Sequence, residues 1–108
     1  MNSEKVAITS KDFWFKIVDF LQQNWALIEK DAESEDCIIY FIHDGSGVFD
    51  QIQYPTLGEA EKALRRNGFE QYAKDPKAQS FIFPPRPPHF SDKHPNGNIY
   101  SSGRFWRS

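Results

Sequence analysis

The sequence predicts a single small α+β domain in which a three-stranded antiparallel meander lies between two helices, in the order α-β-β-β-α. Two observations support this prediction: an apolar run at 37–42 followed by turn residues, and a helix signal at 56–68 with a cap at each end. A chain of 108 residues is long enough for one domain. We expect a flexible N-terminus at 1–9, the α+β domain at 10–83, and an extended, basic and aromatic C-terminal segment at 84–108, rich in proline and packed on the body.

The first predicted helix spans residues 10–24. Apolar residues recur there at helical spacing, and Thr9 or Ser10 can supply the capping side chain. The expected buried stripe consists of Phe13, Ile17, Phe20 and Leu21. Phe15 lies off this stripe, so we expect it either to meet the C-terminal segment or to remain partly exposed.

A short first strand at 25–28 and an acidic loop at 29–36 follow this helix. The loop sequence EKDAESED holds five acids and one lysine, a composition typical of a solvated connection. A calcium loop would need glycine and regularly spaced oxygen ligands, which this loop does not provide.

The two best-defined strands form a hairpin at 37–54. Residues 37–42 are continuously apolar and rich in β-branched and aromatic types, which suits a central strand covered on both faces. Two glycines in the turn at 44–47 supply the backbone freedom of a hairpin. In the return strand at 48–54, Val48, Ile52 and Tyr54 are expected on one face and Phe49 on the other, wetter face.

A helix at 57–67 has the clearest boundaries in the sequence. Thr56 and Glu59 have capping-box spacing, and Gly68 followed by Phe69 fits a Schellman ending. After it we expect a short helical turn at 69–75 that Pro76 ends.

The remaining chain is expected to be mainly extended. Residues 80–83 form either a fourth strand or an extended packed segment, and PPRPP at 84–88 forces a polyproline-like path. Residues 89–97 have the composition of a loop. A proline-rich arm can dock in an aromatic groove of a partner, although carrying the chain around the surface is the simpler role.

Charge is distributed unevenly along the chain. The net formal charge of −2 combines a net of −6 in residues 1–73 with a net of +4 in residues 74–108. The basic tail can either lie against its own acidic body or serve as an arm for an acidic partner. The single Cys allows no internal disulfide, and no apolar run has the length of a signal-peptide core or a membrane span. We therefore expect a soluble, cytoplasmic protein.

Candidate catalytic and metal-binding groups are few. On one extended strand, Cys37 and His43 would be separated by roughly 20 Å, at about 3.3 Å per residue, which excludes a direct dyad. His43 and Asp44 are adjacent, so their side chains are expected on opposite faces. His89, Asp92 and His94 lack the spacing of a zinc motif. We predict no cofactor and no metal site. Whether the protein is an enzyme stays open, and a non-catalytic protein is the favoured expectation.

The predicted element order over residues 10–67 is similar to that of double-stranded-RNA-binding domains. The resemblance is limited to that order. The second helix of that family begins with lysines that meet phosphates, whereas here it begins Thr56-Leu57-Gly58-Glu59-Ala60-Glu61, with two acids that would repel them. No functional residue of that family carries over to this sequence.

Three functions remain open on the sequence alone. The first is a non-catalytic protein-interaction module, for which a small acidic inhibitor or antitoxin-like protein is one concrete form. The second is nucleic-acid binding through the basic, aromatic tail, and the third is an enzyme with a site near His43 and Asp44. The partner-binding candidates are Phe15, Phe49, Arg86, Tyr100, Arg104 and Trp106.

Overall fold

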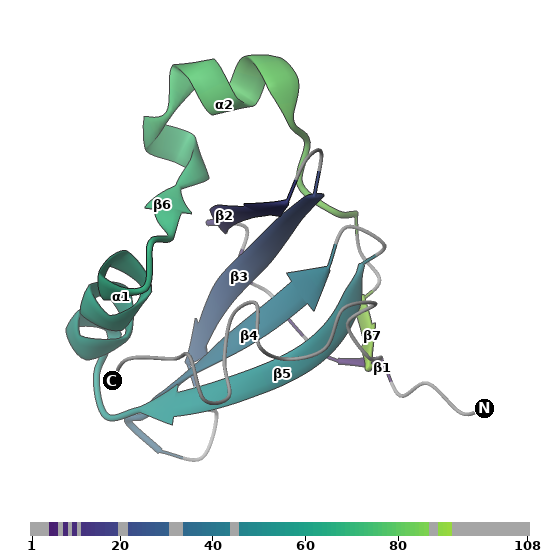
Figure 1. Cartoon of the computed structure of the whole chain (residues 1–108). Helices are drawn as coiled ribbons and strands as arrows, with labels where there is room; N and C mark the ends of the chain where they lie inside the picture. The colour runs from purple at the N-terminus through teal and green to yellow at the C-terminus, as the bar shows by residue number, and fades with distance from the viewer. Residues whose placement is uncertain are drawn as a thin grey trace.

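A seven-stranded mixed sheet dominates the computed structural model, which describes residues 5–6, 8, 10, 12–19, 22–30, 34–43, 46–86 and 89–91. The strand order is β1-β7-β5-β4-β3-β2-β6. The strands are β1 (Lys5–Val6), β2 (Trp14–Asp19), β3 (Gln22–Lys30), β4 (Cys37–His43), β5 (Gly47–Tyr54), β6 (Glu70–Gln71) and β7 (His89–Ser91). The helices are α1 (Leu57–Arg66), the 3-10 helix η1 (Tyr72–Lys74) and α2 (Pro76–Phe81). Figure 1 shows α1 to one side of the sheet, α2 near β2 and β6, and the short strands β1 and β7 at the opposite end.

Strands β2 to β5 form a continuous antiparallel meander. The predicted hairpin at 37–54 is confirmed, because β4 pairs with β5 from Cys37↔Tyr54 onward and lies between β3 and β5 in the sheet. At the far end, β7 runs parallel to β5 and antiparallel to β1. The sheet is therefore mixed, and a segment close to the start of the chain pairs with one close to its end.

Each face of the sheet carries its own hydrophobic cluster. On the α1 side, Trp14, Ile39 and Phe41 pack with Leu64 of the helix. On the other side, Trp25 and Leu27 belong to a second cluster. Ala78 of α2 and Ile82 pack against this cluster. Because side chains alternate between the faces of a strand, the same four central strands supply both clusters.

Helix α1 confirms its predicted boundaries. The Glu59 N–H donates to Thr56 Oγ1 at 3.2 Å, which caps the first turn. At the other end, Gly68 has φ of +86°, and the Phe69 N–H donates to the Leu64 carbonyl at 2.9 Å. The Gly68 N–H donates to the Arg65 carbonyl at 3.1 Å, which completes a Schellman motif.

The predicted α-β-β-β-α fold class is wrong, because its first element is a strand. Residues 14–19 form β2 and β3 already begins at Gln22. Trp14 faces the α1-side cluster, whereas its neighbour Phe15 faces the opposite one. A strand covered on both faces is apolar at successive positions, and such a sequence also satisfies a helical pattern. The order shared with double-stranded-RNA-binding domains is lost with the first helix.

Three further expectations after α1 are corrected. The short helical turn expected before Pro76 is confirmed as η1, but the extended chain expected after it is not: Pro76 occupies the first turn of α2, and Asp75 Oδ1 accepts the Ala78 N–H at 3.0 Å. Ser80 and Phe81 accordingly lie in that helix and not in a fourth strand. Residues 89–91, expected in a loop, form β7.

A β-bulge at Phe49 changes the expected face of two residues. Phe41 pairs with Asp50 and Ile42 pairs with Val48, so Phe49 is the additional residue between them. As a result, Phe49 packs in the α1-side cluster beside Ile52, while Val48 packs in the other cluster. A bulge changes which face the following side chains occupy, which the alternation in the sequence alone could not reveal.

Candidate partner-binding site

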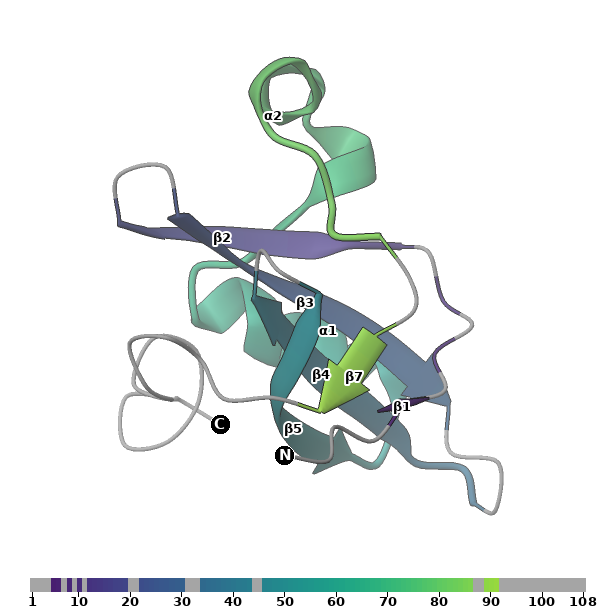
Figure 2. The same cartoon turned by 90° about the vertical axis from the view of Figure 1, so that its right-hand side faces the viewer.

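An apolar groove lies between β2 and α2. It encloses about 230 Å³. Its walls are formed by Phe15, Ile17, Glu70, Asp75, Lys77, Ala78, Phe81 and Ile82. Figure 2 shows α2 and the turn before it beside β2, at the end of the sheet away from β1.

Local hydrogen bonds hold α2 in this position. The Tyr72 N–H donates to the Phe13 carbonyl at 2.9 Å, which fastens the start of η1 to the chain entering β2. The Tyr72 hydroxyl donates to the Ile82 carbonyl at 2.7 Å, and Gln79 Nε2 donates to the Tyr72 carbonyl at 2.9 Å. The middle of α2 and its C-terminal cap are therefore both tied to one tyrosine, which holds this wall of the groove in place.

Large apolar side chains at the groove are exposed. Ile17 is 63% exposed and Phe81 is 76% exposed, whereas Phe15 between them is buried. Phe83, just beyond α2, is 78% exposed. Exposed apolar residues that gather at one groove are a feature of interaction sites.

A second hollow of about 310 Å³ lies on the other side of β6. It shares Glu70 and Asp75 with the groove, and the Arg65 guanidinium lies over the Trp14 ring at 5.0 Å from the ring centroid. Trp14 itself is buried, so this hollow offers mainly charged and polar groups.

His89 is a buried polar side chain at the other end of the sheet. It is 4% exposed, and its Nδ1 has no hydrogen-bond partner among the described residues. Burial lowers the pKa of His89, while a hydrogen bond with the Ser46 backbone acts in the opposite direction. The ring meets Phe13 edge-on with centroids 6.4 Å apart, so its surroundings are apolar.

Among the described residues, the remaining catalytic candidates Cys37 and His43 lie far apart in β4, while Asp92 and His94 lie outside the described residues. Cys37 is buried at one end of β4, and His43 lies at the other end, where its ring stacks on Phe49 at 6.5 Å. Asp44 lies outside the described residues. Within the part of the chain that the structure describes, no three His, Cys, Asp or Glu side chains come together as a metal site would require.

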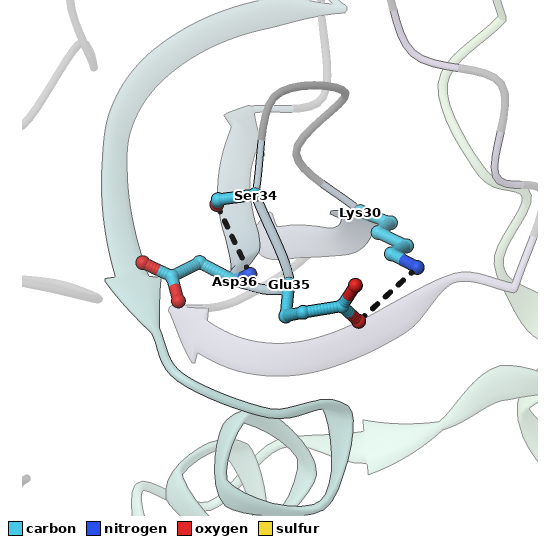
Figure 3. Close-up of polar contacts among 4 residues, drawn as sticks. All are labelled: Lys30, Ser34, Glu35 and Asp36. Atoms are coloured by element: carbon cyan, nitrogen blue, oxygen red, sulfur yellow. Dashed lines mark hydrogen bonds and ion pairs between the residues drawn. The ribbon is translucent and has the colours of Figure 1, made fainter.

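The described part of the connection between β3 and β4, residues 34–36, makes short-range contacts (Figure 3). Ser34 Oγ accepts the Asp36 N–H at 3.1 Å, and Lys30 Nζ lies 3.5 Å from Glu35 Oε2. The Glu35 side chain is 92% exposed, so this ion pair is solvated and contributes little stability.

The structure describes three of the six predicted partner-binding residues, and two of them are buried in different hydrophobic clusters. Phe15 and Phe49 are 5% and 8% exposed and belong to the two clusters, so neither presents a free aromatic surface. Arg86 is exposed, and its carbonyl accepts the Ser46 hydroxyl at 2.7 Å. Tyr100, Arg104 and Trp106 lie outside the described residues, and nucleic-acid binding through them stays a prediction.

Sequence reasoning missed Ile17 and Phe81 as surface residues. Ile17 was expected in the buried stripe of a helix, and Phe81 in either a strand or an extended packed segment. One signal pointed to α2: Asp75 followed by Pro76 is a typical cap and first residue of a helix. The exposure of Ile17 had no such signal, because it depends on how α2, which is distant in the sequence, packs over this face of β2.

No protein-family model, curated protein or solved structure matches this chain. None of the helices in the described ranges combines the length and apolar character of a membrane span. Any functional conclusion must therefore come from the groove and the surfaces around it.

Proposed function

We propose that this chain is a non-catalytic protein-interaction module that binds its partner at the groove between β2 and α2. The observation that supports this proposal is that Ile17 of β2 and Phe81 of α2 are both exposed and line the same hollow as the buried Phe15. Covering one such side chain with a partner is worth about 1.5–3 kcal/mol. Two of them at one groove can anchor a specific contact.

The character of the groove favours binding over catalysis. A catalytic site needs a nucleophile or base within hydrogen-bond reach of a second polar group. The groove walls contain Glu70, Asp75 and Lys77, but their other members are apolar. Its chemistry suits the burial of side chains from another protein.

A comparison of three forms of the full chain tests the proposal: wild type, Ile17→Lys and Leu57→Lys. Leu57 is a matched control, because it is 52% exposed but lies on the first turn of α1, away from the groove. Each form is used to capture partners from a lysate of the source organism, and the captured proteins are identified by mass spectrometry. We expect a partner retained by wild type and Leu57→Lys and lost with Ile17→Lys. Identical capture by all three forms would contradict the proposal.

A small acidic inhibitor or antitoxin-like protein is a second version of the same function. The exposed carboxylate of Glu35 and the acidic loop around it favour this version. Its partner would be cationic, and the complex would weaken as salt screens the attraction. Measuring the affinity of the captured partner at low and high salt separates the two versions, since binding dominated by the apolar side chains of the groove is expected to weaken less with salt than binding to the acidic loop.

A further inference from the structure

Strand β2 has an open edge next to the groove. It pairs with β3 along Trp14–Asp19, but within the described residues it pairs with β6 only at Trp14 and Phe15. Among the described strands, the part of β2 beyond Phe15 therefore has a neighbour on one side alone.

The direction of the backbone groups follows from one hydrogen bond. The Phe13 carbonyl accepts the Tyr72 N–H, so the backbone groups of Phe13 point toward the β6 side. Alternate residues of an antiparallel strand direct their N–H and C=O groups to the same side. The backbone N–H and C=O of Phe15 therefore point toward Glu70, its partner in β6, and those of Ile17 point toward the open edge.

The open edge and the groove share the same residues. Phe15 and Ile17 are two positions apart on β2, so their side chains lie on one face, and both line the groove opposite Ala78 and Phe81. A segment that paired with Ile17 would also place every second side chain against this apolar wall. A helix in the same place would leave the backbone groups at the edge unpaired.

Building on the proposed function, we infer that the groove binds an extended segment of the partner protein, which adds a strand to β2 in line with β6. The apolar side chains of this segment enter the groove between Ile17 and Phe81. The lining of the groove contains two carboxylates, Glu70 and Asp75, and one ammonium group, Lys77. This charge favours a segment that carries Lys or Arg beside its apolar residues.

Selection of displayed random dodecapeptides on the full-length chain tests the inference. We expect selected peptides with apolar residues at every second position and at least one basic residue, and amide NMR shifts on binding at Lys16, Ile17 and Phe81. Methylating single peptide amides in turn gives a decisive readout. Methylation of the peptide amide that pairs with Ile17 should lower the affinity at least fivefold, because it removes a hydrogen bond to the open edge, while methylation of the two neighbouring amides, which point away from β2, should change it less than twofold.

Other occupants give different results in the same experiment. Peptides with apolar residues at every third and fourth position that tolerate amide methylation would overturn the inference in favour of a helix. Concentration-dependent self-association of the chain that Ile17→Lys abolishes would overturn it in favour of a second copy. Selected peptides that bind wild type and Ile17→Lys equally would also overturn it.

The lysate comparison separates this inference from the proposed function. If Ile17→Lys removes the cellular partner but the selected peptides do not bind as strands, the interaction function stands and the inference fails. If the peptides bind as strands while cellular capture is unaffected by Ile17→Lys, the groove binds strands but the proposed function fails.

Discussion

Protonation of His89 would introduce a charge where β7 meets β1 and β5, at a site that offers Nδ1 no partner among the described residues. Its apolar neighbour Phe13 cannot compensate such a charge. A buried imidazole in this position is best accommodated as the neutral form. Protonation of His89 at low pH is therefore expected to weaken the pairing of β7 with β1 and β5.

We expect the free energy of unfolding to fall when the pH is lowered below about 6.5, the ordinary pKa of histidine. Burial lowers the pKa of His89 in the folded state, so between that lowered pKa and 6.5 the unfolded state binds more protons. The stability is then complete above pH 6.5 and is lost as the pH falls through the lowered value. Urea unfolding at pH 7.5 and 5.0 measures this loss, and His89→Phe should reduce it. An unchanged pH dependence in His89→Phe would show that other groups are responsible.

At the scale of single elements, the two ends of α1 carry glycines with opposite requirements. Gly58 lies in the first turn, where an added Cβ would have no heavy atom nearer than Thr56 Oγ1 at 4.0 Å. Gly68 follows the helix with φ of +86°. Its added Cβ would meet only the flexible Lys16 side chain at 3.5 Å, so the cost of substitution there comes from the backbone.

The same substitution at these two sites should change stability in opposite directions. Gly58→Ala is expected to stabilise the protein by about 0.4–1 kcal/mol, because it restricts the unfolded chain without strain. Gly68→Ala is expected to destabilise it by about 1–2 kcal/mol, because alanine resists positive φ. Chemical denaturation of both variants beside wild type measures the difference, and equal signs would contradict the assignment of the Schellman ending.

Elements whose signals are local were predictable from the sequence. The caps of α1 and the apolar run of β4 depend on residues within a few positions of each other, and both match the structure. Strand β2 was mistaken for a helix because Trp14 and Phe15 are each buried against a different cluster, and this depends on strands and helices that lie elsewhere in the sequence. The groove could not be predicted for the same reason, since its walls come from β2 and α2.

At the scale of the whole molecule, the two hydrophobic clusters depend on the same strands. Trp14 reports on one cluster and Trp25 on the other, and they lie on the adjacent strands β2 and β3. If the cluster on one face unfolded, the strands that also carry the other cluster would lose their packing. The two faces should therefore unfold as one unit.

Two variants that each retain one of these tryptophans test this coupling. Trp25→Phe with Trp106→Phe leaves Trp14 as the reporter, and Trp14→Phe with Trp106→Phe leaves Trp25. We expect fluorescence and circular dichroism to give one urea midpoint within each variant, although the two variants can differ from each other in stability. A fluorescence midpoint well separated from that of circular dichroism in either variant would show that the faces unfold independently.

The parallel pairing of β7 with β5 also affects how the protein is made. Gly47 lies opposite Phe90, and Phe90 lies opposite Lys5 as well, so this margin of the sheet cannot close until nearly all of the described chain has left the ribosome. The meander from β2 to β5 can form earlier, because it is built from hairpins between consecutive strands. During translation, the backbone of β5 thus remains available to chaperones until β7 emerges, and closure of this margin is expected to be a late and slow step.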